Sequence, residues 1–169
     1  MQNFRLRLAS AADAASICAI YNLYVATTTI TFEEEAVGEQ DMAQRIAEVG
    51  AASLPWLVLE IDGAVRGYAY ATKWRARSAY RHSVESTVYL DQQAAGHGFG
   101  RVLYGALLDE LRKRELHLVI GGIALPNEAS IGLHEALGFS KVAHFSEVGR
   151  KFGQWLDVGY WELKLQSMR

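Results

Sequence analysis

The feature that most constrains this chain is a glycine-rich loop that separates an apolar strand from an apolar helix. Residues 84–90 form a β-branched and aromatic run typical of a strand. Gly96, Gly98 and Gly100 follow at alternate positions, and apolar residues then recur at helical spacing over residues 99–114. Free N–H groups and the positive dipole end at the start of that helix can bind an anion, and glycines let a phosphate approach the backbone. The pattern therefore predicts a loop that binds a pyrophosphate.

Two other phosphate-binding loops use similar glycines, and neither matches this sequence. A P-loop requires Gly-Lys-Ser or Gly-Lys-Thr, whereas Gly100 is followed by Arg101 and Val102. The dinucleotide-binding fingerprint requires Gly-x-Gly-x-x-Gly, whereas this chain has Gly-x-Gly-x-Gly. A flexible turn without a ligand is the remaining alternative for an isolated glycine cluster, and the flanking residues described below favour cofactor binding over it.

Length and composition indicate one domain, residues 1–169, with a small-molecule partner. With 17 Lys and Arg against 19 Asp and Glu, the chain has no bulk charge that would attract nucleic acid or an anionic membrane. Cys18 is the single cysteine and is interpreted as a small core residue in a reducing compartment. Residues 1–7 lack the apolar segment of a signal peptide, and no apolar run approaches membrane-spanning length. We therefore expect a cytoplasmic protein.

Periodicity along the chain predicts alternating strands and helices. Asp62-Gly63 between two strand-like runs predicts a tight hairpin turn, and the basic, aromatic residues 73–82 predict a loop. The threonine-rich residues 27–32 disfavour helix because consecutive β-branched side chains crowd the preceding turn. The order β-α-α-β-β-β-α-β-α-β-β indicates an α+β protein with a mixed sheet. The predicted strands are residues 4–8, 56–61, 64–71, 84–90, 117–124, 142–145 and 155–163, and the predicted helices begin near Ser10, Gln40, Phe99 and Asn127.

The spacing Gln-x-x-Gly-x-Gly from Gln93 to Gly98, after an acidic strand, resembles motif A of the GNAT superfamily of acetyl-CoA-dependent N-acyltransferases. Residues 55–58, 74–80, 84–89, 133–139 and 151–159 each resemble blocks of a narrower family, the phosphinothricin and methionine sulfoximine N-acetyltransferases. The resemblance implies a GNAT-type, mostly antiparallel central sheet flanked by helices, and transfer of acetyl from acetyl-CoA to the α-amino group of a small amino acid with a sulfoximine, sulfone or phosphinate head. Relatives are commonly homodimers, and the aromatic tail around Trp155 and Trp161 is a candidate interface, with a position in the core as the alternative that the sequence leaves open.

The resemblance also implies which residues contact acetyl-CoA. They lie at the end of the strand before the glycine loop, in the loop itself, and at the start of the helix that Asn127 caps. The set is Val88, Tyr89, Leu90, Gln93, Gly96, His97, Gly98, Phe99, Gly100, Arg101 and Asn127.

Two residues are candidates for proton transfer. A free α-amine is mostly protonated at neutral pH and must lose a proton before it attacks the thioester, so Glu85 on the central strand is a candidate general base, directly or through a water. The alternative is an outward-facing strand carboxylate. His134 lies where many GNAT enzymes carry a tyrosine that serves as the acid, and an imidazole can donate a proton or a hydrogen bond there. The alternative is a core histidine satisfied by a backbone carbonyl.

An amino-acid substrate presents a carboxylate, which suits the planar, permanently charged fork of arginine. Arg75 and Arg77 are both candidates, and the sequence leaves the choice between them open. The four remaining histidines show no metal-ligand spacing, so no metal is implied. The predicted substrate-binding set is Phe32, Arg75, Arg77, Tyr80, Glu85, Ser86, Thr87 and Trp155, with the aromatic members weighed against simple core positions.

Two other functions compete with a small-molecule N-acetyltransferase. Acetylation of a protein N-terminus or lysine would favour an open peptide groove over a pocket that bears arginine. A module that binds acetyl-CoA without turnover would not need Glu85 or His134.

Overall fold

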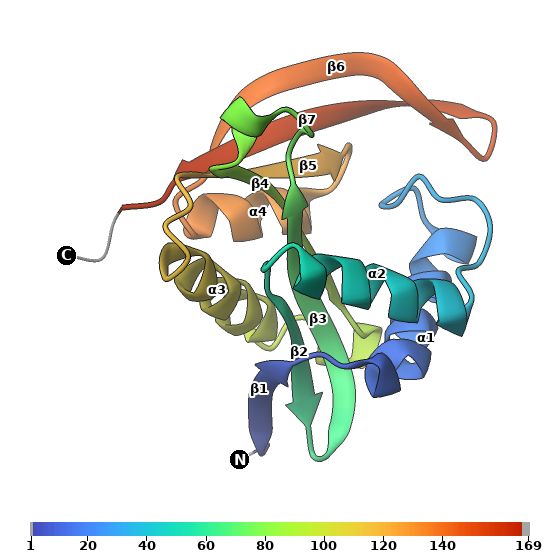
Figure 1. The fold of residues 1–169 in the computed structure, drawn as a ribbon. Helices are drawn as coiled ribbons and strands as arrows, with labels where there is room; N and C mark the ends of the chain where they lie inside the picture. Colours follow the sequence, from blue (N-terminus) through green and yellow to red (C-terminus); the bar gives the residue numbers. More distant parts are fainter. Residues whose placement is uncertain (1, 167–169) are drawn as a thin grey trace.

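The computed structural model describes residues 2–166, which form one seven-stranded sheet covered by helices on both faces (Figure 1). The order along the sheet is β1-β2-β3-β4-β5-β7-β6, and only the β4–β5 pair is parallel. The predicted α+β class, the element order and the mostly antiparallel sheet are confirmed. In chain order the elements are β1 (Phe4–Leu8), α1 (Ala14–Thr27), α2 (Glu39–Ala51), β2 (Trp56–Ile61), β3 (Ala64–Lys73), β4 (Ser83–Leu90), α3 (Phe99–Arg112), β5 (Leu118–Ala124), α4 (Glu128–Ala136), β6 (Ser140–Lys151) and β7 (Gln154–Lys164).

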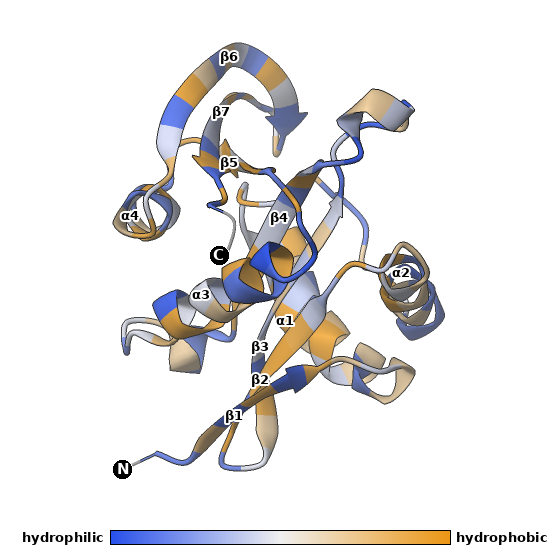
Figure 2. Cartoon of the chain, turned by 60° about the vertical axis from the view of Figure 1, so that its left-hand side comes forward, coloured by the Kyte–Doolittle hydropathy of each residue, from blue (hydrophilic) through white to orange (hydrophobic). Residues whose placement is uncertain are grey.

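Each face of the sheet has its own hydrophobic core because successive side chains of a strand point to opposite faces. In β2, Trp56 and Val58 pack toward α1 and α2, whereas Leu57 and Leu59 pack toward α3. Figure 2 shows the hydrophobic residues concentrated on the central strands and on the inner sides of the helices. Cys18 lies in the α1–α2 core, as predicted. Within residues 2–166, no helix has the length and apolar character needed to cross a bilayer.

The predicted β2–β3 hairpin is confirmed. Asp62 and Gly63 both have positive φ, 50° and 83°, which is the conformation a two-residue hairpin turn requires. The loop expected over residues 73–82 is shorter than predicted, since β3 continues to Lys73 and a 3-10 turn spans Ser78–Tyr80.

The C-terminal hairpin differs from the prediction in two ways. A strand over residues 142–145 was too short, because β6 runs from Ser140 to Lys151 and pairs with β7 to the Phe152-Gly153 turn. A bulge between Phe145 and Gly149 interrupts the pairing, and its backbone is held by Asp157, whose Oδ1 accepts a hydrogen bond from Glu147 N at 2.8 Å. This bulge breaks the simple alternation that identifies a strand.

Trp161 is a core residue and does not belong to an exposed interface. Its side chain is 2% exposed and its indole N–H donates to Glu135 Oε1 at 3.3 Å. Trp155, by contrast, is 60% exposed. The tail therefore divides into a buried tryptophan in the sheet and an exposed one near the hairpin turn.

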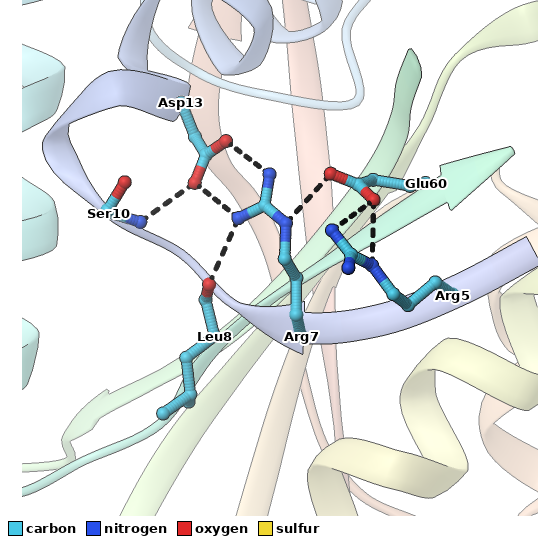
Figure 3. Close-up of polar contacts among 6 residues, drawn as sticks. All are labelled: Arg5, Arg7, Leu8, Ser10, Asp13 and Glu60. Atoms are coloured by element: carbon cyan, nitrogen blue, oxygen red, sulfur yellow. Dashed lines mark hydrogen bonds and ion pairs between the residues drawn. The ribbon is translucent and has the colours of Figure 1, made fainter. Parts of the chain in front are cut away.

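The N-terminal strand is tied to α1 and β2 by a chain of charged groups (Figure 3). The guanidinium of Arg7 donates to both carboxylate oxygens of Asp13, at 2.8 and 2.7 Å, and to Glu60 at 2.8 Å. Asp13 also accepts from Ser10 N at 2.8 Å, which closes the turn that leads into α1. These contacts lower the pKa of Asp13, with the Arg7 hydrogen bonds as the largest cause.

Candidate functional site

The site begins where β4 and β5 separate. The two parallel strands pair only over Ser83–Glu85 and Leu118–Ile120, after which β4 continues beside β3 and β5 beside β7. Where a strand has no neighbour, its backbone N–H and C=O groups are unpaired and can form hydrogen bonds with an extended ligand. A cleft of about 100 Å³ lies at this split. It is lined by Ile30, Glu85, Ser86, Thr87, Val88, Tyr89, Gly122, Ile123, Ala124, Asn127, Ser130 and His134.

The glycine loop follows the end of β4 and leads into α3. Gly96 and Gly98 have φ of 79° and 82°, a left-handed conformation that glycine adopts without strain. Helical hydrogen bonding begins with Val102 N to Gly98 O at 3.3 Å, so the three amides before Val102 are not used within the helix. The loop is exposed. An exposed left-handed turn at a helix N-terminus fits the anionic pyrophosphate of acetyl-CoA.

The residues predicted around this loop take different positions. Gln93 lies in the 3-10 turn Gln92–Ala94, where its N–H donates to Asp91 Oδ1 at 2.8 Å, and His97 and Arg101 are exposed. The Phe99 ring is buried against Phe4.

At the end of β4, the Leu90 carbonyl accepts from Tyr24 Oη at 2.6 Å. Asn127 caps α4 as predicted, with Oδ1 accepting from Ser130 N at 3.2 Å, and it also lines the cleft. Asn127 therefore caps α4 and is also placed where it could contact acetyl-CoA.

Glu85 faces the α1–α2 side of the sheet, together with Thr87 and Tyr89. Burial is the main cause that raises the pKa of its carboxyl, and the positive charge of Arg75 partly opposes the shift. A carboxylate whose pKa lies nearer to neutrality is a better proton acceptor for an amine at physiological pH than an exposed one. The sequence could not establish this burial.

A cavity of about 360 Å³ opens in front of Glu85. Its walls are mostly aromatic and apolar, and they come from the loop after α1, from β4 and β5, and from the β6–β7 hairpin. A substrate side chain would lie against these walls, with its amine toward the carboxylate. The lining residues are Ile30, Thr31, Phe32, Glu85, Tyr89, Gly122, Ala124, Phe145, Val148, Val158 and Tyr160.

Arg75 lines an adjoining cavity of about 200 Å³ that shares Phe145 and Tyr160 with the first. Its guanidinium lies 4.8 Å from the centre of the Trp74 ring, and Trp74 in turn contacts Tyr160 edge-on at 5.8 Å. This stacking restrains a long side chain beside the amine-binding cavity. Arg75 and Glu85 thus provide a cation and a carboxylate on neighbouring walls.

Five predicted substrate contacts line neither of these two cavities, and two of the five, Ser86 and Thr87, line the cleft between β4 and β5 instead. Arg77, Tyr80 and Trp155 are exposed on loops or at the hairpin end. The Ser86 hydroxyl points to the opposite face of the sheet, into the core beside α3. Phe32 lies at the first cavity, and Thr87 lines the cleft between β4 and β5.

His134 belongs to a buried hydrogen-bonded chain. Its Nδ1 lies 2.7 Å from Ser130 O, so this nitrogen carries the proton and Nε2 accepts from Tyr104 Oη at 3.0 Å. Tyr104 Oη lies 2.5 Å from Ser86 Oγ. Burial lowers the pKa of His134 and raises that of Tyr104, which keeps both groups neutral.

Sequence reasoning missed Tyr104 and Tyr160. Tyr104 is an aromatic residue on the inner face of α3, a position that periodicity assigns to the core without indicating what its hydroxyl contacts. The sequence offered one signal, which is that Tyr104 carries a polar hydroxyl although it occupies a helix position that faces the core. The contact itself joins residues from β4, α3 and α4.

Comparisons with known proteins agree with this geometry. A model of the acetyltransferase (GNAT) domain matches residues 6–159. A phosphinothricin N-acetyltransferase of Streptomyces viridochromogenes is 40% identical over 157 residues, covering 93% of this chain and 85% of the relative. An L-methionine sulfoximine/L-methionine sulfone acetyltransferase of Salmonella typhimurium is 40% identical over 165 residues, covering 96% of this chain and 95% of the relative.

A solved structure gives the same result at the level of the fold. It is that of a GNAT superfamily phosphinothricin acetyltransferase from Sinorhizobium meliloti in complex with acetyl-CoA, which superposes with a TM-score of 0.93 at 37% identity and covers 96% of this chain and 88% of that one. A family model that spans most of the chain and relatives at this identity establish membership. The chain belongs to the GNAT family and is an acetyl-CoA-dependent N-acetyltransferase.

Proposed function

We propose that this enzyme acetylates the α-amino group of a small amino acid with a compact polar head, such as methionine sulfoximine, methionine sulfone or phosphinothricin. The observation that supports this most is the placement of Glu85 and Arg75 on adjoining cavities that share Phe145 and Tyr160. An α-amino acid carries an amine and a carboxylate one carbon apart, which matches a proton acceptor beside a cation. The names of the relatives point to the same class of substrate.

Acetyl-CoA, when bound, supplies an acetyl thioester at the split between β4 and β5. The glycine loop and Arg101 would hold its pyrophosphate through backbone amides and charge, and Val88, Tyr89 and Asn127 would line the path of its arm. Glu85 accepts the proton of the α-ammonium group, so that the amine has a free electron pair. The amine would then attack the thioester carbonyl, the C–S bond would break, and coenzyme A would leave as a thiolate that takes its proton from solvent. His134 has its Nδ1 proton bound to Ser130 O and its Nε2 occupied by Tyr104, so its role would be to position the cleft wall and not to donate a proton.

Arg75 is the stronger of the two candidates for the substrate carboxylate. Both side chains are exposed, but Arg75 lines the cavity that adjoins the amine-binding one and stacks on Trp74, whereas Arg77 precedes the 3-10 turn and lines neither cavity. A charged, bidentate contact both neutralises the carboxylate and orients the amine. Arg77 and Tyr80 would then approach the substrate only from the solvent side.

We also propose the domain organisation, oligomeric state and location of the enzyme. Residues 1–169 would form one acyltransferase domain that acts as a homodimer in the cytoplasm. Exposed apolar side chains along β6–β7, including Val148, Phe152 and Trp155, support a partner surface there. Light scattering coupled to size exclusion tests the dimer, and a mass of one chain would contradict it.

The proposed activity is tested by a panel of amines with acetyl-CoA, scored by released thiol. Methionine sulfone, methionine sulfoximine and phosphinothricin should be acetylated, while their decarboxylated analogues should be poor substrates. Replacing Arg75 with Lys should lower kcat/KM by roughly 10- to 150-fold, equivalent to about 1.5–3 kcal/mol, where the bound substrate desolvates the charged hydrogen bond whose fork is lost. Arg77→Lys is the matched variant and should change it less. Preferential turnover of a peptide N-terminus or lysine would favour the protein-acetylating alternative instead.

A further inference from the structure

Lys151 is a buried lysine that the proposed chemistry does not use. It is the last residue of β6, its side chain is 2% exposed, and burial is the main cause that lowers its pKa. Its Nζ donates a hydrogen bond to the main-chain carbonyl of Thr31 at 2.8 Å. Burying an ammonium group is costly. Such a residue therefore calls for an explanation beyond packing.

The contact joins two segments that are far apart in the chain. Thr31 lies in the loop between α1 and α2, and Lys151 lies at the turn of the β6–β7 hairpin, which reaches over that loop (Figure 1). Thr31 is also held from the other side, since its hydroxyl lies 2.7 Å from Tyr21 Oη in α1. The loop is thus fixed between a helix and the hairpin.

The next residue in the loop, Phe32, forms part of the substrate cavity. Its ring packs directly on Gly149 of β6, so closely that a Cβ at that position would collide with it. Phe145 and Val148, on the same hairpin, line the same cavity. The docking of the hairpin on the loop therefore joins two walls of the site that touch at Phe32 and Gly149.

We infer that Lys151 is a positioning residue: its hydrogen bond to Thr31 clasps the 28–32 loop to the β6–β7 hairpin and holds Phe32 in the wall that receives the substrate side chain. This rests on the proposed amino-acid substrate. A wall that is ordered before binding lowers the entropy lost when the substrate binds. The lysine-containing block at residues 151–159, noted in the sequence, acquires a physical role through this contact.

Lys151→Met tests the clasp because it removes the ammonium group and keeps most of the apolar stem. With methionine sulfone as substrate, KM should rise on the order of 10-fold while kcat changes by less than about threefold. The dissociation constant of acetyl-CoA, measured by calorimetry, should not change. Lys164→Met, at an exposed position of β7, is the matched control and should leave all three values at those of the parent.

A second variant, Gly149→Ala, and a second measurement, hydrogen exchange, test the role of Lys151 independently of the Lys151→Met kinetics. Gly149→Ala displaces the Phe32 ring without touching Lys151 and should raise the same KM. Hydrogen exchange of amides 29–33 should quicken in Lys151→Met and not in Lys164→Met, whether or not the enzyme turns over this substrate. If the parent is inactive on amino acids, the proposed function fails and exchange alone decides the clasp. Unchanged exchange in a folded Lys151→Met variant, or an unchanged KM in an active one, would overturn the inference.

Discussion

At the scale of single residues, Glu85 is expected to control the chemical step. Glu85→Gln keeps the shape of the side chain but cannot accept the proton of the amine, so kcat should fall by about 100- to 10,000-fold. The acetyl-CoA dissociation constant should stay constant. Glu48→Gln changes an exposed carboxylate on the outer surface of α2 and should retain full activity. A kcat for Glu85→Gln within a few-fold of the parent would show that another group or bulk water removes the proton.

The pH dependence of the reaction should reveal the environment of Glu85. Its pKa is raised by burial and partly lowered by Arg75, so kcat/KM should decrease as the pH falls through a value above the usual 4.3 of glutamate. Arg75→Met removes the charge that favours the ionised form. The acidic limb of the kcat/KM profile should therefore move to higher pH in this variant.

Arg77→Met is the control for the pH profile. The substrate amine titrates identically in every variant, so only the difference between profiles reports on Glu85. An acidic limb that stays in place in Arg75→Met would mean that Arg75 is too distant or too well screened to affect the carboxylate.

At the scale of elements, the turn from the glycine loop into α3 should determine cofactor affinity. Gly98 caps the helix with φ of 82°, and a left-handed conformation costs an L-residue about 1–2 kcal/mol. With Ala the exposed, ligand-free loop can relax out of the left-handed conformation, and acetyl-CoA binding then has to restore it. Gly98→Ala should therefore weaken acetyl-CoA binding by roughly 5- to 30-fold in a calorimetric titration.

Gly105→Ala provides a control within the same helix. A Cβ at that position meets no atom within 4 Å, so the substitution should leave affinity unchanged and slightly stabilise α3. Equal affinities for both variants would show that the glycine loop does not hold the pyrophosphate.

At the scale of the whole molecule, the Arg7–Asp13 pair links the first strand to the rest of the fold. Asp13→Asn removes a charge that accepts three hydrogen bonds at a buried position, and should lower the free energy of unfolding by about 1.5–3 kcal/mol in urea titrations at pH 7. Asp109→Asn breaks an exposed pair with Arg112 and should cost less than about 1 kcal/mol.

The contribution of Asp13 to the free energy of unfolding should decrease at acidic pH. Its folded-state pKa is depressed, so the contribution is complete above the unfolded pKa of about 3.9 and is lost as the pH falls through the lower, folded value. The stability difference between the parent and Asp13→Asn should shrink over that acidic range. A difference that stays constant down to the lowest pH would mean that the charge of Asp13 does not contribute.

The sequence by itself determined the features that depend on neighbours along the chain. Hydrophobic periodicity identified the helices and all seven strands, Asp62-Gly63 identified the β2–β3 turn, and Asn127 identified the cap of α4. These are local effects. Side-chain direction repeats about every two residues in a strand and about every four in a helix, and a turn is determined by about four consecutive residues. Motif spacing likewise indicated the family, since the glycines and the flanking strand lie within one short segment.

Only the tertiary structure decided how distant residues meet. The full length of β6 depends on pairing with β7 across a bulge, the Ser86–Tyr104–His134 chain joins three elements, and Lys151 contacts a carbonyl 120 positions earlier. No periodicity encodes such contacts, because their geometry depends on how the elements pack. The burial that raises the pKa of Glu85 arises in the same way, from walls that separate parts of the chain supply.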